Sequence, residues 1–394
     1  MQLYPNYSPY YEYTLKIKDA SNPRKPGSVV LSTPSHLFED YQLKIAYRKY
    51  KTTKSIPTEA KRINFIFLHG NGMNKSIWHY HIDKLFTQYE LNFPDLYIDT
   101  IIAPDHVNMG DSCFINKDKL GHICDWEDLA KDYIMICKIH ERETFLHPNS
   151  FNVIVSHSMS GYIALNITNF EPNLFQSSIL INPIVISNST VDKSLTNYLQ
   201  DWYNQGYIKY NFDNIPPNQN WYELIYQHYT NKSFYKYFEP IILRNMIEDE
   251  IPNNYQRSHY YNEVDLKHNG LYDFVNYSYS INNPSFDYDK IKVPTKIICG
   301  DKDLNSNMIV PEIKKQLAFA KTLTILKNQY HNMHAQSPDL IISSINKFVV
   351  ETFNSYQREN DKEYYEKYGK DYKQILMKKK LSEFLNNDKI PTKL

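Results

Sequence analysis

Apolar residues in this chain gather into short runs that are separated by longer amphipathic stretches. From position 63 onward these runs are mostly continuous rather than alternating, as in strands that are buried on both faces of a parallel sheet. They are rich in β-branched and aromatic residues, which favour strands. Eight strands are therefore predicted, at 28–33, 42–50, 63–68, 100–104, 151–155, 178–182, 295–299 and 323–326.

Helical periodicity lies between many of these strands. It predicts helices over 76–88, 126–142 and 160–170, and another over 310–321 before the last strand. Strands that alternate with helices predict an α/β fold with a doubly wound, mostly parallel sheet of eight strands.

One long interval breaks this alternation. Between 185 and 288 no clear strand is present, and aromatic residues recur at irregular, partly helical spacing. The interval predicts a helical cap inserted after the sixth strand, although ordinary packing helices would show the same pattern. We therefore expect a core formed by 1–184 and 289–350, a cap or lid at 185–288, and a charged helical tail at 351–394.

Composition narrows the classes of function. Lys plus Arg and Asp plus Glu number 44 each, so no excess of basic residues is present for binding nucleic acid or anchoring to a membrane. No run approaches the ~20 apolar residues of a membrane span, and the polar N-terminal region has no apolar segment typical of a secretory signal. The four cysteines lack C-x-x-C spacing, which favours free thiols over disulfides or a zinc site. No metal or cofactor is expected.

The strongest chemical signal follows the predicted strand at 151–155. Residues 156–160 read Ser-His-Ser-Met-Ser, and a helical pattern follows at once. A strand, a serine between small residues and a helix form the pattern of a nucleophile elbow, usually written G-x-S-x-G. Ser156 and Ser160 replace the two glycines and depart from this pattern. Ser158 is the predicted nucleophile, and a chance serine-rich turn is the alternative.

An acid and a base are predicted after the seventh and eighth strands. Asp301 and Asp303 follow the seventh strand, and His331 follows the eighth. The order serine, acid, histidine is typical of a triad in which the histidine takes the serine proton and the carboxylate orients the histidine. We expect Asp303 rather than Asp301 to be the acid, because the first residue past a strand more often faces into the turn. His334 is the alternative base.

Two loops complete the chemical pattern. Residues 68–73 read Leu-His-Gly-Asn-Gly-Met after the third strand, and His69 is expected to brace this loop. Residues 105–112 read Asp-His-Val-Asn-Met-Gly-Asp-Ser after the fourth strand. Asp105 and Asp111 are expected to accept hydrogen bonds from backbone amides rather than to act as catalytic acids.

In order and spacing, the two loops, the elbow and the acid and base positions resemble the α/β-hydrolase family over about 63–348. Within it the chain is most similar to the fungal (yeast) peroxisomal lipase-type serine hydrolases. That similarity is carried by 68–75 with Trp78, by 108–112, by Leu120-Gly121 with Trp126, and by 172–175.

The resemblance implies further site residues. In this fold the backbone amides after the third strand and after the nucleophile form the oxyanion hole, which corresponds to Asn71 and Met159 here. Some relatives place their acid where this chain has Asn182. An amide cannot play that part, which favours Asp303 as the acid.

The predicted function is cleavage of acyl esters by a lipase or esterase, through an acyl-enzyme on Ser158. A thioesterase or lactonase on the same scaffold is an alternative, whereas epoxide hydrolysis would require a carboxylate in the elbow. A non-catalytic binding protein of the same fold is a second alternative, favoured by the missing glycines and opposed by the intact Ser158, Asp303 and His331. A third alternative is a membrane-associated protein that binds lipid through the lysines at 378–380. Three lysines alone are too few to anchor a protein stably.

The last three residues of the sequence are Thr392, Lys393 and Leu394. They are similar to the Ser-Lys-Leu address that the peroxisomal import receptor reads. With the family resemblance, they imply a location in the peroxisome matrix and that receptor as a partner. The cytoplasm is the alternative.

Overall fold

The computed structural model describes residues 8–29, 42–92, 97–116, 119–184, 235–250, 290–303 and 320–371, together with 374, 377, 378 and 381. By its contacts the chain divides into two compact units, Met1–Asn346 and Lys347–Leu394. The first unit contains the sheet. The predicted division into core, cap and tail stays a prediction, since most of 185–288 lies outside the described residues.

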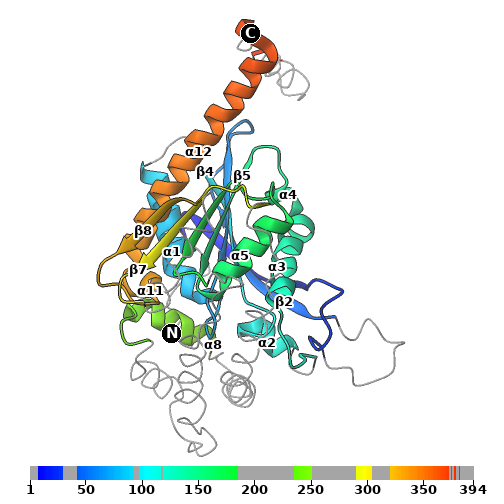
Figure 1. Ribbon diagram of the computed structural model, residues 1–394, viewed down its shortest axis with the longest axis vertical. Coiled ribbons are helices and arrows are strands. Elements are labelled where there is room, and N and C mark those ends of the chain that lie inside the picture. The colour runs from blue at the N-terminus through cyan, green and yellow to red at the C-terminus, as the bar shows by residue number, and fades with distance from the viewer. Residues whose placement is uncertain are drawn as a thin grey trace, which may run out of the picture. The chain divides into compact units, whose positions relative to one another are not determined.

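Eight strands form one sheet in the order β1-β2-β4-β3-β5-β6-β7-β8 (Figure 1). The pairs β1/β2 and β2/β4 are antiparallel, and all other neighbours are parallel. The predicted α/β fold with a mostly parallel sheet is therefore confirmed. The strands are β1 (Tyr11–Asp19), β2 (Lys44–Thr52), β3 (Arg62–Leu68), β4 (Tyr97–Pro104), β5 (Ser150–His157), β6 (Ser177–Ile181), β7 (Thr295–Gly300) and β8 (Ala320–Leu326).

The central strands are apolar because helices cover both faces of the sheet. Every residue of β5, β6 and β7 is buried. In Figure 1, α3 (Trp126–Met135) and α5 (Met159–Phe170) lie on one side of the sheet, and α1 (His79–Asn92) lies on the other. A buried cluster joins α3 and α5 to the strands through residues such as Trp126, Ile163 and Ile154. This explains the continuous apolar runs.

The remaining helices are short, except for α12 near the end of the chain. Helix α3 starts at a cap in which the side chain of Asp125 accepts a hydrogen bond from the Glu127 amide. The helix predicted over 126–142 is divided into α3, the π-helix η3 (Ile136–His140) and α4 (Arg142–Phe145). The others are η2 (Lys75–Trp78), α2 (Gly110–Asn116), α8 (Pro240–Glu250), α11 (Met333–Gln336), α12 (Pro338–Tyr368) and η6 (Gly369–Asp371).

Two predicted elements are wrong at the level of their boundaries. The first strand is β1 and not 28–33, where Val29 makes only an isolated bridge with Leu120 and 30–33 lies outside the described residues. Strand β1 escaped prediction because it is an edge strand, with Leu15 and Ile17 half exposed among polar neighbours. The helix predicted over 310–321 is wrong at its end, because β8 begins at Ala320; residues 310–319 lie outside the described residues.

Candidate active site

The predicted nucleophile lies in a strained turn between β5 and α5. Ser158 has φ 55° and ψ −121°, in a region that side-chain-bearing residues rarely adopt. The carbonyl of Ser158 accepts hydrogen bonds from the amides of Gly161 (2.8 Å) and Ile184 (2.9 Å), and its amide donates to Ile181 (3.0 Å). The turn is therefore fixed by bonds from α5 and from the end of β6 with the loop that follows it, and Ser158 lies directly after the carboxyl end of β5.

The two serines that replace glycine fit into this turn. Both are fully buried. The hydroxyl of Ser160 donates to the carbonyl of His69, and that of Ser156 donates to the carbonyl of Ile179 at 3.5 Å. Glycine is required one residue later, since a Cβ on Gly161 would lie 2.4 Å from Pro183 Cβ. The departure from G-x-S-x-G thus adds a bond between the elbow and the loop after β3.

Ser158, His331 and Asp303 are brought together by the structure. The Oγ atom of Ser158 lies 2.8 Å from Nε2 of His331, and Nδ1 of His331 lies 3.1 Å from Oδ2 of Asp303. A carboxylate can only accept, so Nδ1 carries the proton and donates to Asp303, which leaves Nε2 to accept from the serine hydroxyl. The side chain of Asp303 is 4% exposed and that of His331 is 14% exposed, so the pair is largely shielded from water.

The alternative base and acid lie elsewhere. His334 is fully buried, and its ring lies 4.0 Å from that of His157 and 4.9 Å from Trp78, measured between centroids. Asp301 is half-buried in the turn before Asp303 and its amide donates to Leu326. The structure brings Asp303 and His331, rather than Asp301 and His334, together with Ser158, and their roles as acid and base stay a prediction.

The predicted oxyanion loop packs closely on the elbow. Met159 is the first residue of α5, directly after the nucleophile, and Asn71 lies in the turn after β3. A Cβ on Gly70 would lie 2.5 Å from Nδ1 of His157 and 3.3 Å from Cβ of Ser158. Glycine at position 70 lets the loop backbone approach the serine. The assignment of Asn71 and Met159 as oxyanion donors stays a prediction.

A buried ion pair anchors the same loop. Nζ of Lys75 lies 2.9 Å from a carboxylate oxygen of Asp105 and 2.9 Å from one of Asp111. Asp105 also accepts from the amides of Lys75 (2.8 Å) and Asp111 (2.9 Å). Its expected structural role is therefore what the contacts show. His69 is also structural, with Nδ1 bonded to the carbonyl of Gly70 at 2.8 Å. The role of Lys75 was missed, because nothing near it in the sequence indicates that it pairs with the buried Asp105 and the largely buried Asp111.

Histidines around the site are held neutral by burial. Removal from water lowers the pKa of His157 to about 3 and the pKa values of His81 and His106 to about 4. The same cause, together with the neighbouring His106, lowers the pKa of His69 well below its usual range. These rings therefore act as neutral hydrogen-bonding groups at physiological pH.

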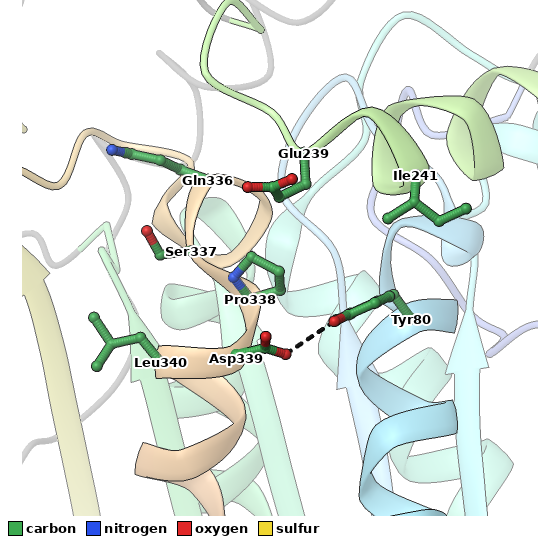
Figure 2. A pocket seen from close by; sticks show the side chains of 8 residues that line it. All are labelled: Tyr80, Glu239, Ile241, Gln336, Ser337, Pro338, Asp339 and Leu340. Atoms are coloured by element: carbon green, nitrogen blue, oxygen red, sulfur yellow. Dashed lines mark hydrogen bonds between the residues drawn. The ribbon is translucent and has the colours of Figure 1, made fainter.

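A pocket lies beside the start of α12, and its lining does not include Ser158, His331 or Asp303. It has a volume of about 330 Å³ and is lined by residues from α1, α8 and the 336–340 segment, including Tyr80, Glu239 and Gln336. Figure 2 shows the hydroxyl of Tyr80 donating to Asp339, at 2.9 Å. Most of the cap predicted over 185–288, from which a pocket for an acyl chain would be built, lies outside the described ranges.

Neither a metal-binding cluster nor a membrane-spanning helix is found among the described residues. In that part of the chain, no group of three or more His, Cys, Asp or Glu side chains could hold a metal ion. Across the same described ranges, no helix combines the length and apolar character that crossing a bilayer requires.

Known proteins resemble the chain over most of its length. Residues 65–343 match the Alpha/beta hydrolase family. A protein named peroxisomal membrane protein LPX1, from Saccharomyces cerevisiae, is 28% identical over 85% of this chain and 86% of its own length. The crystal structure of peroxisomal alpha-beta-hydrolase Lpx1 from that yeast matches with a TM-score of 0.66 and 26% identity, over 87% of this chain and 89% of the other.

A second kind of relative matches only in part. The type I acyl-CoA thioesterase mpaH of Penicillium roqueforti is 31% identical over 161 residues, which is 41% of this chain and 35% of the thioesterase. The resemblance predicted from the motifs is confirmed, since the family match covers both the elbow and the acid and base positions. This chain belongs to the α/β hydrolase family.

Proposed function

We propose that this protein is a serine hydrolase that cleaves acyl esters, with Ser158 as nucleophile, His331 as base and Asp303 as the acid that orients the base. The observation that carries the proposal is the continuous set of contacts from Ser158 Oγ to His331 Nε2 (2.8 Å) and from His331 Nδ1 to Asp303 (3.1 Å). Membership of a hydrolase family and the strained elbow at Ser158 support it.

In this mechanism His331 removes the hydroxyl proton as Ser158 attacks the ester carbonyl. The proton then goes to the departing alcohol, and an acyl-enzyme forms on Ser158. A water molecule, deprotonated by the same imidazole, attacks the acyl-enzyme, and its proton returns to Ser158 as the acid is released. Asp303 holds the tautomer and stabilises the imidazolium in both steps.

Developing negative charge on the substrate oxygen requires preorganised donors. We assign them to the backbone amides of Asn71 and Met159. The position of Met159 at the start of α5 supports this, because the helix N-terminus favours negative charge. The close approach of Gly70 to the elbow supports the contribution of the loop.

Acyl thioesters are a second candidate substrate class. The observation that favours them is the similarity to an acyl-CoA thioesterase over 161 residues. The same groups would serve, since a thiolate is a better leaving group than an alkoxide and places no new demand on the base.

The test is hydrolysis of p-nitrophenyl esters with acyl chains from about two to sixteen carbons, beside acyl-CoA thioesters. The wild-type protein is expected to hydrolyse medium- or long-chain esters, and Ser158→Ala to lose about 10⁴-fold or more in kcat. Turnover of acetyl esters alone would contradict the lipase assignment, and preference for the thioesters would select the second candidate.

A fluorophosphonate probe supplies the control that does not depend on substrate choice. It should label the wild-type protein covalently and leave Ser158→Ala unlabelled, with both shown to be folded by circular dichroism. A folded wild-type protein that never reacts would identify a non-catalytic binding protein of the same fold.

We also propose that the protein acts in the peroxisome. The name of the yeast relative, a peroxisomal protein, supports this location. Thr392, Lys393 and Leu394, which lie outside the described residues, would contact the import receptor. Microscopy of a tagged chain with and without these three residues tests the address directly.

A further inference from the structure

The loop that carries His331 is held from several directions. It follows β8 and contains Asn328, whose φ is 56°. Gln336, on the rim of the pocket in Figure 2, accepts from the Tyr330 amide and donates to the Asn328 carbonyl, both at 3.0 Å. These bonds restrain the loop at Asn328 and Tyr330. The loop at His331 itself is restrained by residues of other elements.

Two buried side chains bond the backbone carbonyl of His331. Nε2 of His157 lies 3.0 Å from this oxygen and Nδ2 of Asn182 lies 2.7 Å from it. Asn182 also donates to the carbonyl of Tyr330 at 3.0 Å. His157 and Asn182 are 0% and 1% exposed, so water does not compete for these bonds. One carbonyl therefore receives a donor from the end of β5 and another from the end of β6.

Asn182 also connects the base to the turn that carries the acid. It has φ 40°, a conformation that asparagine tolerates better than most residues. Its Oδ1 accepts from the amide of Gly300 at 2.9 Å. Gly300 itself must be glycine, because a Cβ there would lie 2.2 Å from the carbonyl oxygen of Gln329. The side chain of Asn182 thus bonds both to Gly300, just before the turn that contains Asp303, and to the loop that contains His331.

His157 connects the base to the nucleophile. It immediately precedes Ser158, and its ring centroid lies 5.0 Å from that of His331. Burial keeps it neutral, and a carbonyl can only accept, so Nε2 carries the proton and donates. Any shift of the base loop relative to the elbow must stretch this bond, because donor and nucleophile share adjacent backbone units.

We propose that His157 and Asn182 are positioning residues that set the place of His331 by donating together to its backbone carbonyl. This inference rests on the proposed function and adds to it the groups that fix the distance between nucleophile and base. Near-attack geometry is sensitive to small displacements, and a shift of about 1 Å can cost about 100-fold in rate.

The test uses substitutions that remove the donor group and keep the other contacts or the length of the side chain; the negative charge that Asn182→Asp adds is matched in the control variant described below. Asn182→Asp keeps the acceptor for Gly300 and the tolerance of positive φ, but loses both donated bonds. His157→Met and His157→Gln are similar in length, and only glutamine can donate from the position of Nε2. We expect Asn182→Asp and His157→Met to lower kcat about 10- to 100-fold with little change in KM, and His157→Gln to restore most of the loss.

Asn152 provides a matched control. Its Nδ2 donates to the carbonyls of Phe145 (2.8 Å) and Leu174 (2.9 Å), and its Oδ1 accepts from Asn64 (3.1 Å). Asn152→Asp therefore removes two bonds donated to backbone carbonyls and adds one negative charge, as Asn182→Asp does, at a buried site near the start of β5. It should lower the melting temperature as much as Asn182→Asp does and leave kcat unchanged.

Crystal structures of the variants give a readout that needs no substrate. The distance from Ser158 Oγ to His331 Nε2 should exceed its present 2.8 Å in Asn182→Asp and His157→Met and remain unchanged in Asn152→Asp. If this distance and kcat respond no more than in the control, the positioning role is overturned. If instead Ser158→Ala retains hydrolysis, the proposed function fails, and the measured distance still decides the positioning role.

Discussion

At the scale of single residues, the geometry separates two acids that the sequence leaves almost equivalent. Asp301 and Asp303 both follow β7, two positions apart. Only Asp303 lies within hydrogen-bonding distance of His331, among the contacts of the described residues. The choice from sequence depended on a rule about turns, and the geometry now gives it a direct reason.

This difference predicts the behaviour of a pair of variants. Asp303→Asn should lower kcat by about 10³- to 10⁴-fold, because an amide no longer requires the tautomer with the proton on Nδ1. Asp301→Asn should remain within a few-fold of the wild-type protein. The measurement is steady-state hydrolysis of one ester by both variants, after confirming equal melting temperatures. Comparable losses in the two would argue against Asp303 as the orienting acid.

At the scale of elements, the loop after β3 is fixed by a charge buried beneath it. Lys75 is 1% exposed and Asp105 is fully buried. Glycine at 110, with φ 54°, brings α2 close enough that a Cβ there would lie 2.4 Å from Cγ of Asp105. The ion pair therefore joins η2, the end of β4 and the start of α2, and it supports the loop that contains Asn71.

Lys75→Met should destabilise the protein by about 3–5 kcal/mol, since it leaves two carboxylates near a site from which water is excluded. Lys131→Met is the matched control, because its pair with Asp128 is made by a side chain 43% exposed and should contribute about 0–1 kcal/mol. Chemical denaturation of both variants gives the comparison. Equal losses would show that burial of the Lys75 pair has no special weight.

The elements themselves were predictable to different degrees. Strands that are buried on both faces, such as β5 and β7, appear in the sequence as continuous apolar runs and can therefore be predicted. Strand β1 could not be predicted in this way, because it is an edge strand that pairs only with β2 and leaves Leu15 and Ile17 half exposed. The π-helix η3 was also missed, because it continues directly from α3 and the whole of 126–142 was predicted as one helix.

At the scale of the whole molecule, the order of the parallel strands made it possible to predict which residues of the candidate site lie close together. Parallel strands end at one edge, so residues after β5, β7 and β8 must meet there. The bonds that orient them were not predictable, because they join residues such as Asn182 and His331 that lie 149 positions apart. Side-chain donors to a backbone carbonyl leave no mark in the local pattern.

Neutral buried histidines make the stability of the fold depend on pH. His81, for example, binds a proton in the unfolded chain below about pH 6.5. In the folded protein its pKa is lowered to about 4 by burial. Between these values the unfolded chain binds more protons, so the free energy of unfolding falls as pH is lowered, by about 1.4 kcal/mol per unit for each such histidine. His106 and His157 act in the same direction.

The melting temperature should therefore decrease as pH is lowered from about 6.5 to 4. His81→Gln removes one titrating ring and keeps a donor for the carbonyl of His334, which Nε2 of His81 contacts at 2.9 Å. This variant should show a shallower decrease over the same interval. Parallel curves for the variant and the wild-type protein would exclude His81 as a contributor.

The positive φ of Ser158 has a consequence for how this sequence can change over time. Folding alone would favour glycine at position 158, since glycine adopts this conformation without steric cost. The hydroxyl is thus kept against the preference of the backbone, and stability and activity make opposing demands on one position. In a descendant that no longer needed the proposed chemistry, substitution of Ser158 by glycine would give a more stable protein, and the proposed nucleophile would be among the first groups to be lost.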